Sequence, residues 1–287
     1  MSPSRTLSPL RIAVLLNSYR SPFITDIRDS YVRTITAAAN LGSEDDEANT
    51  TPELTFFYPA ENEDEFPDPD EYDLIVIGGG NVDPRRKMPW ISKLHQFILD
   101  VVAHHPQTKL CGICWGHQTI CMLFGAELVD METPELGVTE AQLTPAGRRF
   151  LHRPNPSLPA YNINNSTNIS ISINKDPTTL RLQQHHRRAV GSPPVRGGFH
   201  ELLADNQAFL NHNNTILTWQ GHPEKDAKCA KLRVRDATRW FSISAEEEKA
   251  ALAEVEKVMG EEDDGREVWV RILEWVRGEH PGYQVHL

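Results

Sequence analysis

The chain has 287 residues, of which 39% are hydrophobic, and it carries a formal net charge of −11 at pH 7. This length and composition predict a globular protein with a sizeable core. The acidic balance gives no electrostatic basis for nucleic-acid binding, and no apolar run approaches the roughly 18 residues of a membrane-spanning helix, so we expect neither kind of partner.

The first half of the chain alternates short apolar runs, typical of buried strands, with longer runs of helical spacing. The predicted strands are Arg11–Leu16, Glu53–Tyr58, Tyr72–Ile77 and Lys109–Ile113, and the predicted helices are Ile27–Asn40, Trp90–His104 and Trp115–Phe124. We expect Gly78, Gly79 and Gly80 to end the third strand. Apolar strands separated by helices are typical of a parallel sheet covered on both faces.

The second half is less regular. Its predicted strands are Ala126–Val129, Val138–Leu143, Leu180–Gln184, Gly198–Ala204 and Thr215–Gln220. Its predicted helices are Thr144–Leu151, Glu224–Phe241, Glu246–Met259 and Arg266–Val276. Residues 152–179 are rich in Asn, Ser and Pro, so we expect a surface insertion there. We find no internal repeat and no clear linker, which indicates one domain.

The four cysteines do not form the pattern of a disulfide framework, because three of them lie within eleven residues. The apolar stretch near the N-terminus, IAVLL, is too short for the core of a signal peptide. Both observations favour a cytoplasmic protein in a reducing compartment. We expect no metal site and no cofactor, since the histidines show no ligand spacing with a second cluster.

A G-x-C-x-G motif, Gly112–Gly116, lies where a buried strand ends and a helix begins. Such a turn presents a nucleophile in a strained conformation, and its flanking glycines avoid clashes between strand and helix. The positive end of the helix would favour the thiolate of Cys114. The alternatives are a structural cysteine and a redox pair with Cys111, and the position of Cys111 inside a strand disfavours the latter.

A thiol nucleophile needs a base, and the base needs a group that orients it. The segment His222-Pro223-Glu224 follows an apolar strand and a glycine. Residues two apart in an extended segment point the same way, so His222 and Glu224 can address one site. Alone, this segment is better explained as a turn histidine and a helix-capping glutamate. Together with the G-x-C-x-G motif, it predicts a catalytic triad.

The segments Gly112–Gln118 (GICWGHQ) and Gly221–Glu224 (GHPE) together resemble the class I glutamine amidotransferase family. The resemblance covers roughly residues 10–240. It implies an α/β, flavodoxin-like, three-layer fold with a central, mostly parallel sheet. We therefore expect a glutamine amidotransferase domain at residues 10–241 and a helical extension at residues 242–287 that packs on it.

The resemblance also implies an activity, the hydrolysis of a γ-glutamyl amide through a thioester. Cys114 would attack the amide carbon. His222 would protonate the leaving nitrogen and then activate water, and Glu224 would orient the imidazole. The oxyanion needs N–H donors, which we expect from the backbone of Trp115 and from Gly80, with Gly79 as the second candidate.

Four further residues are expected to bind substrate by the same resemblance. Gln118 would help to hold the glutamyl backbone, and the segment around Leu136 and Gly137 would line the same pocket. His186 lies in register with a histidine of the family, but Arg188 stands where an acid is usual. The His/Arg segment is either a basic loop that meets a substrate carboxylate or a merely solvated turn.

No synthetase-like segment follows residue 241, so the domain looks most like the stand-alone GMP-synthase-like branch, which includes γ-glutamyl peptidases acting on glutathione and its conjugates. Hydrolysis of glutamine or of such a small γ-glutamyl substrate is the favoured function. An ammonia-supplying subunit of a separate synthase and a catalytically silent binding protein are the alternatives. Thiol hydrolases with a histidine directly after the nucleophile are disfavoured, because Trp115 follows Cys114.

Overall fold

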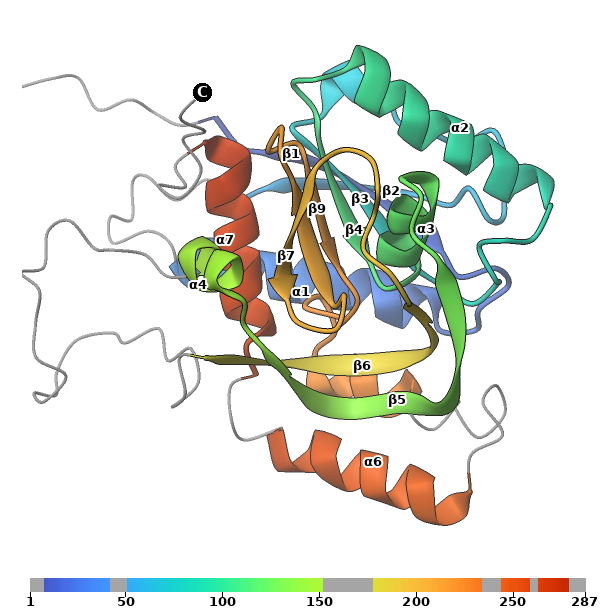
Figure 1. The fold of residues 1–287 in the computed structure, drawn as a ribbon, viewed down its shortest axis with the longest axis vertical. Coiled ribbons are helices and arrows are strands. Elements are labelled where there is room, and N and C mark those ends of the chain that lie inside the picture. The colour runs from blue at the N-terminus through green and yellow to red at the C-terminus, as the bar shows by residue number, and fades with distance from the viewer. Residues whose placement is uncertain (1–7, 42–50, 152–177, 234–243, 259–262, 279–287) are drawn as a thin grey trace, which may run out of the picture.

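The apolar strands of the N-terminal half form one side of a seven-stranded sheet in the computed structural model, which describes residues 8–41, 51–151, 178–233, 244–258 and 263–278 (Figure 1). Its strands, in spatial order, are β2 (Glu53–Phe57), β1 (Arg11–Asn17), β3 (Leu74–Gly80), β4 (Lys109–Ile113), β9 (Ile216–Trp219), β8 (Ala208–Asn211) and β7 (Phe199–Leu203). The pairs from β2 to β9 are parallel, and β8 and β7 continue the sheet antiparallel. The predicted α/β fold with a mostly parallel sheet is confirmed.

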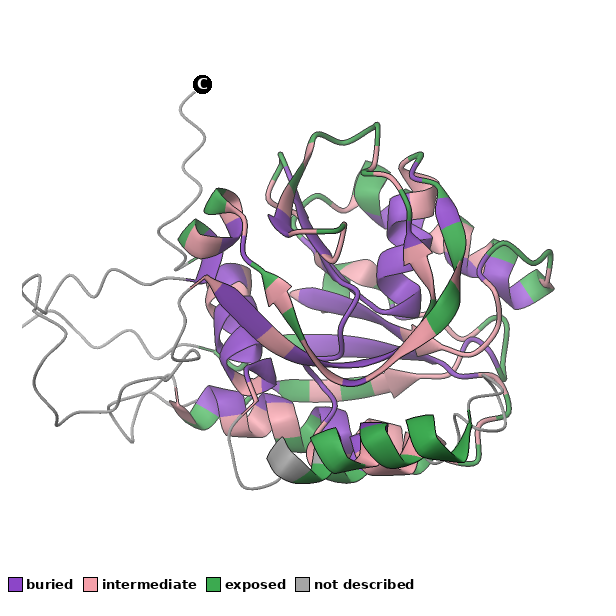
Figure 2. Ribbon diagram, turned by 60° about the horizontal axis from the view of Figure 1, so that its bottom comes forward, coloured by how far each residue is buried: buried purple, intermediate pink, exposed green. Residues whose placement is uncertain are grey.

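Helices cover both faces of this sheet. They are α1 (Ile24–Leu41), α2 (Pro89–His104), α3 (Trp115–Leu123), α4 (Pro145–Leu151) and α7 (Gly265–Arg277), while α6 (Ala245–Val258) lies on the small second sheet. Side chains alternate along β1, so that Ile12 and Val14 pack toward α1 and α7 while Ala13 and Leu15 pack toward α2 and α3. Figure 2 shows the buried strands between helices that are exposed on their outer sides. Of the helices described, none is long and apolar enough to cross a membrane.

A second, two-stranded sheet crosses below the first (Figure 1). It pairs β5 (Leu128–Gln142) with β6 (Thr179–Val190) in antiparallel register, interrupted between Asp130 and Glu135. Helix α6 packs against β5. Because β6 passes the carboxyl ends of the parallel strands, this small sheet closes one side of the region where a ligand would bind in such a fold.

Several predicted elements are wrong in detail. The predicted strands Ala126–Val129 and Val138–Leu143 form the single strand β5, and the predicted strand Leu180–Gln184 extends to Val190 as β6, so the His/Arg segment is not a loop. Much of β5 is exposed, and the buried part of β6 includes the polar residues Gln183, Gln184 and His185. Neither strand therefore shows a continuous apolar pattern. Strand β8 was not predicted, because four residues are too few for a periodic signal.

The three glycines Gly78, Gly79 and Gly80 do not end the third strand but form its last part. The helix predicted from Glu224 begins at residue 227. Its end, most of the predicted insertion at residues 152–179, and the predicted end of the next helix at Met259 lie outside the described residues.

Helix α7, in the predicted extension, packs against α1. The indole of Trp269 is fully buried, with its ring edge-on to that of Tyr31 at 6.3 Å between centroids. Lys109 Nζ donates to the carbonyl of Trp275 at 2.6 Å, and the Trp275 indole N–H donates to Asn214 at 2.7 Å. These contacts make α7 a part of the core.

We predict that Trp269→Ala lowers the free energy of unfolding by about 3–5 kcal/mol, because it leaves a large cavity between α7 and α1. Urea denaturation followed by circular dichroism measures the change. The matched control is Val32→Ala, on the exposed side of α1 at 40% exposure, which should cost less than about 1 kcal/mol. Equal losses for the two variants would contradict the assignment of α7 to the core.

Candidate active site

Cys114 lies at the sharp turn between β4 and α3. Its backbone has φ +50° and ψ −99°, a conformation that residues other than glycine seldom adopt. The Cys114 N–H donates to the carbonyl of Trp219 at 2.8 Å, and the Cys114 carbonyl accepts from the N–H of Gln118 at 2.9 Å. The strained residue is therefore held by a neighbouring strand and by the helix that it begins.

The two glycines that flank Cys114 allow strand and helix to meet at backbone distance. A Cβ at position 116 would lie 1.9 Å from the carbonyl oxygen of Ile77, and a Cβ at position 112 would lie 2.8 Å from the backbone of Gly116. Any side chain at either position would push α3 away from β3 and β4. The G-x-C-x-G pattern is thus explained by packing as well as by the turn.

The imidazole of His222 is oriented by Glu224. His222 Nδ1 lies 2.7 Å from Glu224 Oε1, and both side chains are buried. Because a carboxylate can only accept a hydrogen bond, Nδ1 carries the proton and Nε2 of the neutral ring carries a lone pair. Among the residues that the structure describes, His222 Nε2 has no hydrogen-bond partner.

The turn that carries this pair is tied to distant parts of the chain. The N–H of His222 donates to the carbonyl of Gln183 in β6 at 2.9 Å. The hydroxyls of Ser30 and Thr34, on α1, donate to the carbonyl of Glu224 at 2.8 and 3.2 Å. The sequence contains no signal for these α1 contacts, because the partners are more than 180 positions apart.

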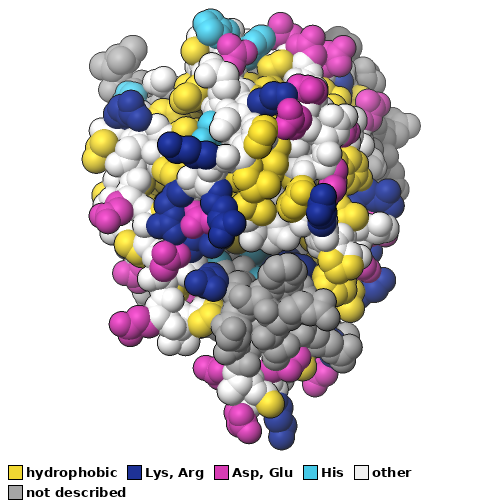
Figure 3. Space-filling view, turned by 90° about the vertical axis from the view of Figure 1, so that its right-hand side faces the viewer, with side chains coloured by type: hydrophobic (Ala, Val, Ile, Leu, Met, Phe, Trp, Pro, Cys, Tyr) yellow, Lys and Arg dark blue, Asp and Glu magenta, His cyan; other side chains and the backbone are white. Residues whose placement is uncertain are grey.

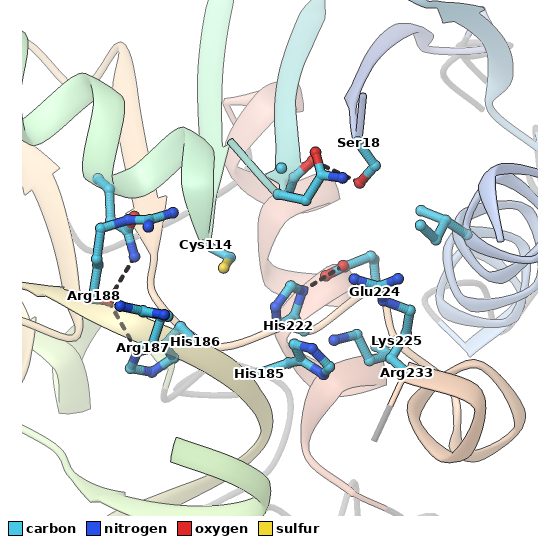
Figure 4. A pocket seen from close by; sticks show the side chains of 15 residues that line it. Ser18, Cys114, His185, His186, Arg187, Arg188, His222, Glu224, Lys225 and Arg233 are labelled. Atoms are coloured by element: carbon cyan, nitrogen blue, oxygen red, sulfur yellow. Dashed lines mark hydrogen bonds and ion pairs between the residues drawn. The ribbon is translucent and has the colours of Figure 1, made fainter. Parts of the chain in front are cut away.

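One cavity, open to solvent, brings most of the predicted residues together (Figure 4). The predicted residues that line it are Cys114, His222, Glu224, Gly79, Gly80, Gln118 and His186. The cavity lies at the carboxyl ends of the parallel strands, between α1 and β6.

Three predicted residues do not line the cavity. The side chain of Trp115 is buried beneath it, where its indole N–H donates to the carbonyl of Val82 at 2.6 Å. Leu136 packs against the cluster of Ala230 and Ala251, and a Cβ at Gly137 would lie 3.3 Å from the carbonyl oxygen of Ala251. Leu136 and Gly137 therefore lie against α6, and their role in substrate binding stays a prediction.

Gln118 and His186 join α3 to the small sheet. Gln118 Nε2 donates to the carbonyl of Arg188 at 2.7 Å and to Gln220 Oε1 at 3.2 Å, so only the carbonyl oxygen of its amide is left to meet a ligand. His186 Nδ1 lies 3.0 Å from the Arg188 carbonyl and Nε2 lies 2.9 Å from Glu135 Oε2. These contacts fix the wall of the cavity that carries Arg188.

Burial keeps the candidate nucleophile and base neutral. It raises the pKa of the Cys114 thiol to about 11, although Lys225, Arg188 and the N–H of Trp115 act in the opposite direction. Burial also lowers the pKa of His222 to about 4, an effect that Lys225 increases and Glu224 opposes. The thiolate predicted from the helix end is therefore not the resting form, because the loss of hydration outweighs the helix end.

Sequence reasoning missed two cationic residues of the cavity, Lys225 and Arg233. Lys225 directly follows the His-Pro-Glu segment, and this position was the one available signal.

Within the described ranges, no three His, Cys, Asp or Glu side chains are grouped so that they could hold a metal ion.

Comparison with known proteins gives a consistent result. Residues 26–236 match the family model described as glutamine amidotransferase class-I. The glutamine amidotransferase-like protein chyE of Penicillium rubens is 26% identical over 274 residues, which are 94% of this chain and 98% of that protein. A glutamine-hydrolysing GMP synthase subunit from Sulfurisphaera tokodaii is 30% identical over 159 residues, 54% of this chain and 68% of that protein.

Solved structures agree on the fold. A glutamine amidotransferase from Thermotoga maritima superposes with a TM-score of 0.60 at 16% identity, over 94% of this chain and 99% of that one. A glutamine amidotransferase from Methylobacillus flagellatus superposes with a TM-score of 0.55 at 18% identity, over 98% and 99% of the two chains.

We predict that the reaction of Cys114 with iodoacetamide accelerates about tenfold per pH unit from pH 6 to about pH 10. The raised pKa of the folded thiol means that the reactive thiolate is a small fraction at neutral pH and grows until about pH 11. Mass spectrometry of the peptide that contains Cys114 measures the rate. The control is the urea-unfolded chain, whose rate should level off above about pH 8.5. A plateau below pH 8 in the folded protein would indicate a thiolate–imidazolium pair instead.

Proposed function

The chain belongs to the class I glutamine amidotransferase family, and we propose that it hydrolyses a γ-glutamyl amide bond with Cys114 as nucleophile, His222 as base and Glu224 as orienter. One observation carries the proposal. The lone pair of His222 Nε2 is fixed by Glu224, has no partner among the described residues, and faces the same cavity as the strained Cys114. A nucleophile, an oriented base and a cavity are the parts that acyl transfer needs.

The first half of the proposed reaction begins from the neutral pair. His222 Nε2 takes the proton of the Cys114 thiol while the sulfur attacks the γ-carbonyl carbon, and Glu224 stabilises the imidazolium that forms. The oxyanion accepts hydrogen bonds from the backbone N–H groups of Trp115 and of Gly80 or Gly79. His222 then gives its proton to the leaving nitrogen, the C–N bond breaks, and a γ-glutamyl thioester remains.

In the second half, water attacks the thioester carbon and gives a proton to His222. The C–S bond breaks, glutamate leaves, and the proton returns to the sulfur. The step needs no further reactant, and His222 acts once as acid and once as base in each half.

The glycine segment at the end of β3 supports the assigned oxyanion donors. A Cβ at Gly79 would lie 3.3 Å from His222 Cε1, and a Cβ at Gly80 would lie 2.8 Å from Trp115 Cγ. Glycine therefore lets this backbone approach the site closely. Asn17 Nδ2 donates to the carbonyl of Gly78 at 3.1 Å, which fixes the orientation of the adjoining peptide groups.

A second candidate function is the supply of ammonia from glutamine to a separate synthase. The similarity to one subunit of a GMP synthase supports it. We favour hydrolysis, because the described cavity holds the nucleophile, the base and the orienting group that it needs. All four cysteines are buried free thiols, and we propose a reducing, cytoplasmic setting on that ground.

We predict that Cys114→Ser lowers glutamate release at least about 10³-fold, because a hydroxyl is a far poorer nucleophile here. The assay measures glutamate released from glutamine and from γ-glutamyl peptides by the purified chain. The control is Cys121→Ala, which removes a buried thiol from α3, the helix that follows Cys114, and should stay within about threefold. Full activity of Cys114→Ser would exclude Cys114 as the nucleophile.

We predict that Glu224→Gln lowers kcat by about 10²–10⁴-fold. The amide can donate to His222 Nδ1, which places the ring proton on Nε2 and removes the lone pair that faces the thiol. Asp226→Asn is the matched control, since Asp226 pairs with Arg33 outside the cavity at 2.6 Å. A kcat that falls equally in both variants would speak against an orienting role for Glu224.

A further inference from the structure

The candidate cavity is strongly cationic although the chain is acidic. Among the described residues, four cationic side chains line it, namely Arg187, Arg188, Lys225 and Arg233, against one carboxylate, that of Glu224. That carboxylate is already engaged by His222. An excess of positive charge inside a cavity, in a chain of net charge −11, favours an anionic ligand.

Basic side chains outside the cavity form ion pairs with carboxylates. Arg85 pairs with Asp83 at 2.7 Å and with Asp130 at 3.0 Å. Lys93 pairs with Glu63 at 2.9 Å. Figure 3 shows the same mixing on one face of the molecule, where Lys and Arg side chains lie among Asp and Glu. Among the described residues, no such ion pair is formed by Arg187, Arg188 or Lys225 of the cavity.

Lys225 is the cation that lies beside the candidate base. The residue is only 7% exposed, and burial lowers the pKa of its ammonium group, although the charge of Glu224 acts in the opposite direction. Within the part of the chain that the structure describes, no hydrogen bond or ion pair reaches Lys225 Nζ, while its backbone N–H closes the turn to His222 at 3.2 Å. A buried cation without a partner is costly, and an anionic ligand would remove that cost.

The cations lie on two sides of the candidate nucleophile. In Figure 4, Arg187 and Arg188 lie to the left of Cys114, and Lys225 and Arg233 lie to the right, beyond His222. Both Arg188 and Lys225 act on the pKa of the Cys114 thiol, so both lie within electrostatic reach of the sulfur. The cavity therefore presents positive charge at two ends.

We propose that Lys225, together with Arg233, binds a carboxylate on the leaving amine, so that the preferred substrates are γ-glutamyl derivatives of amino acids or peptides rather than glutamine. This inference rests on the function proposed above. The leaving nitrogen must receive its proton from His222 Nε2, which places the leaving group on the side of His222, where Lys225 lies. Ammonia, the leaving group of glutamine, carries nothing that could reach Lys225. The α-carboxylate of the γ-glutamyl group then binds at the other end of the cavity, where Arg188 lies.

Two substrates that differ only in charge test this proposal. They are γ-glutamylalanine and γ-glutamylalanine amide, whose leaving amines have nearly the same size. We expect kcat/KM of the full-length protein to be at least about tenfold higher for the acid than for the amide, since charge-assisted hydrogen bonds are the stronger ones. Lys225→Met should lower this ratio about tenfold, whereas Lys228→Met, at an exposed position three residues further on, should leave it unchanged.

The ratio separates binding of the carboxylate from a structural role, because a damaged fold would lower both rates together. A wild-type protein without preference for the acid, or a Lys225→Met variant with an unchanged ratio, would overturn the proposal.

If none of the γ-glutamyl compounds is hydrolysed, the proposed function itself is wrong. A second measurement then tests the anion subsite without turnover. Bromoacetate and bromoacetamide alkylate thiols and differ in charge. We expect Cys114 to favour bromoacetate in the wild type and to lose about tenfold of that preference in Lys225→Met. The same preference in both proteins would overturn the anion subsite independently of turnover.

Discussion

Helix α3 begins against the backbone of β3, at a contact so close that only glycine fits at position 116. A Cβ there would lie 1.9 Å from the carbonyl oxygen of Ile77. This contact sets the start of the helix, and with it the strained turn at Cys114, the position of the Trp115 N–H and the direction of the Gln118 side chain. The nucleophile side of the candidate site therefore depends on one backbone approach between a helix and a sheet.

Burial is the second constraint, and it determines the charge state of the site. The thiol of Cys114 and the imidazole of His222 are both held neutral because water is largely excluded from them. Cations from two sides act against this effect at the sulfur, and Glu224 acts against it at the imidazole. A neutral pair of this kind suits a mechanism in which the proton moves as the sulfur attacks, because the charges form only where the surrounding groups can stabilise them.

Parts of the fold with a strong local signal were predictable. The central strands and the helices between them were expected at nearly their observed positions, since continuous apolar runs and helical spacing are visible in one dimension. The small sheet was not predictable in this way. Strand β5 is partly exposed, β6 buries polar side chains, and the pairing of the two joins residues that are about 40 to 60 positions apart. The four-residue strand β8 is held by its neighbours in the sheet rather than by its own pattern.

The sequence alone determined the family resemblance and the candidate triad. The glycines of the G-x-C-x-G motif and the His-Pro-Glu segment can be read from short stretches of sequence, because the local geometry of each turn requires these residues. Only the tertiary structure decided what surrounds the triad. Ser30 and Thr34 of α1 hold the turn of Glu224, β6 brings Arg188 to one side of Cys114, and Lys225 is buried on the other side. The tertiary structure also places Leu136 and Gly137 against α6, outside the cavity. Contacts of this kind depend on how distant segments pack, and burial, which sets the pKa values, exists only once they have packed.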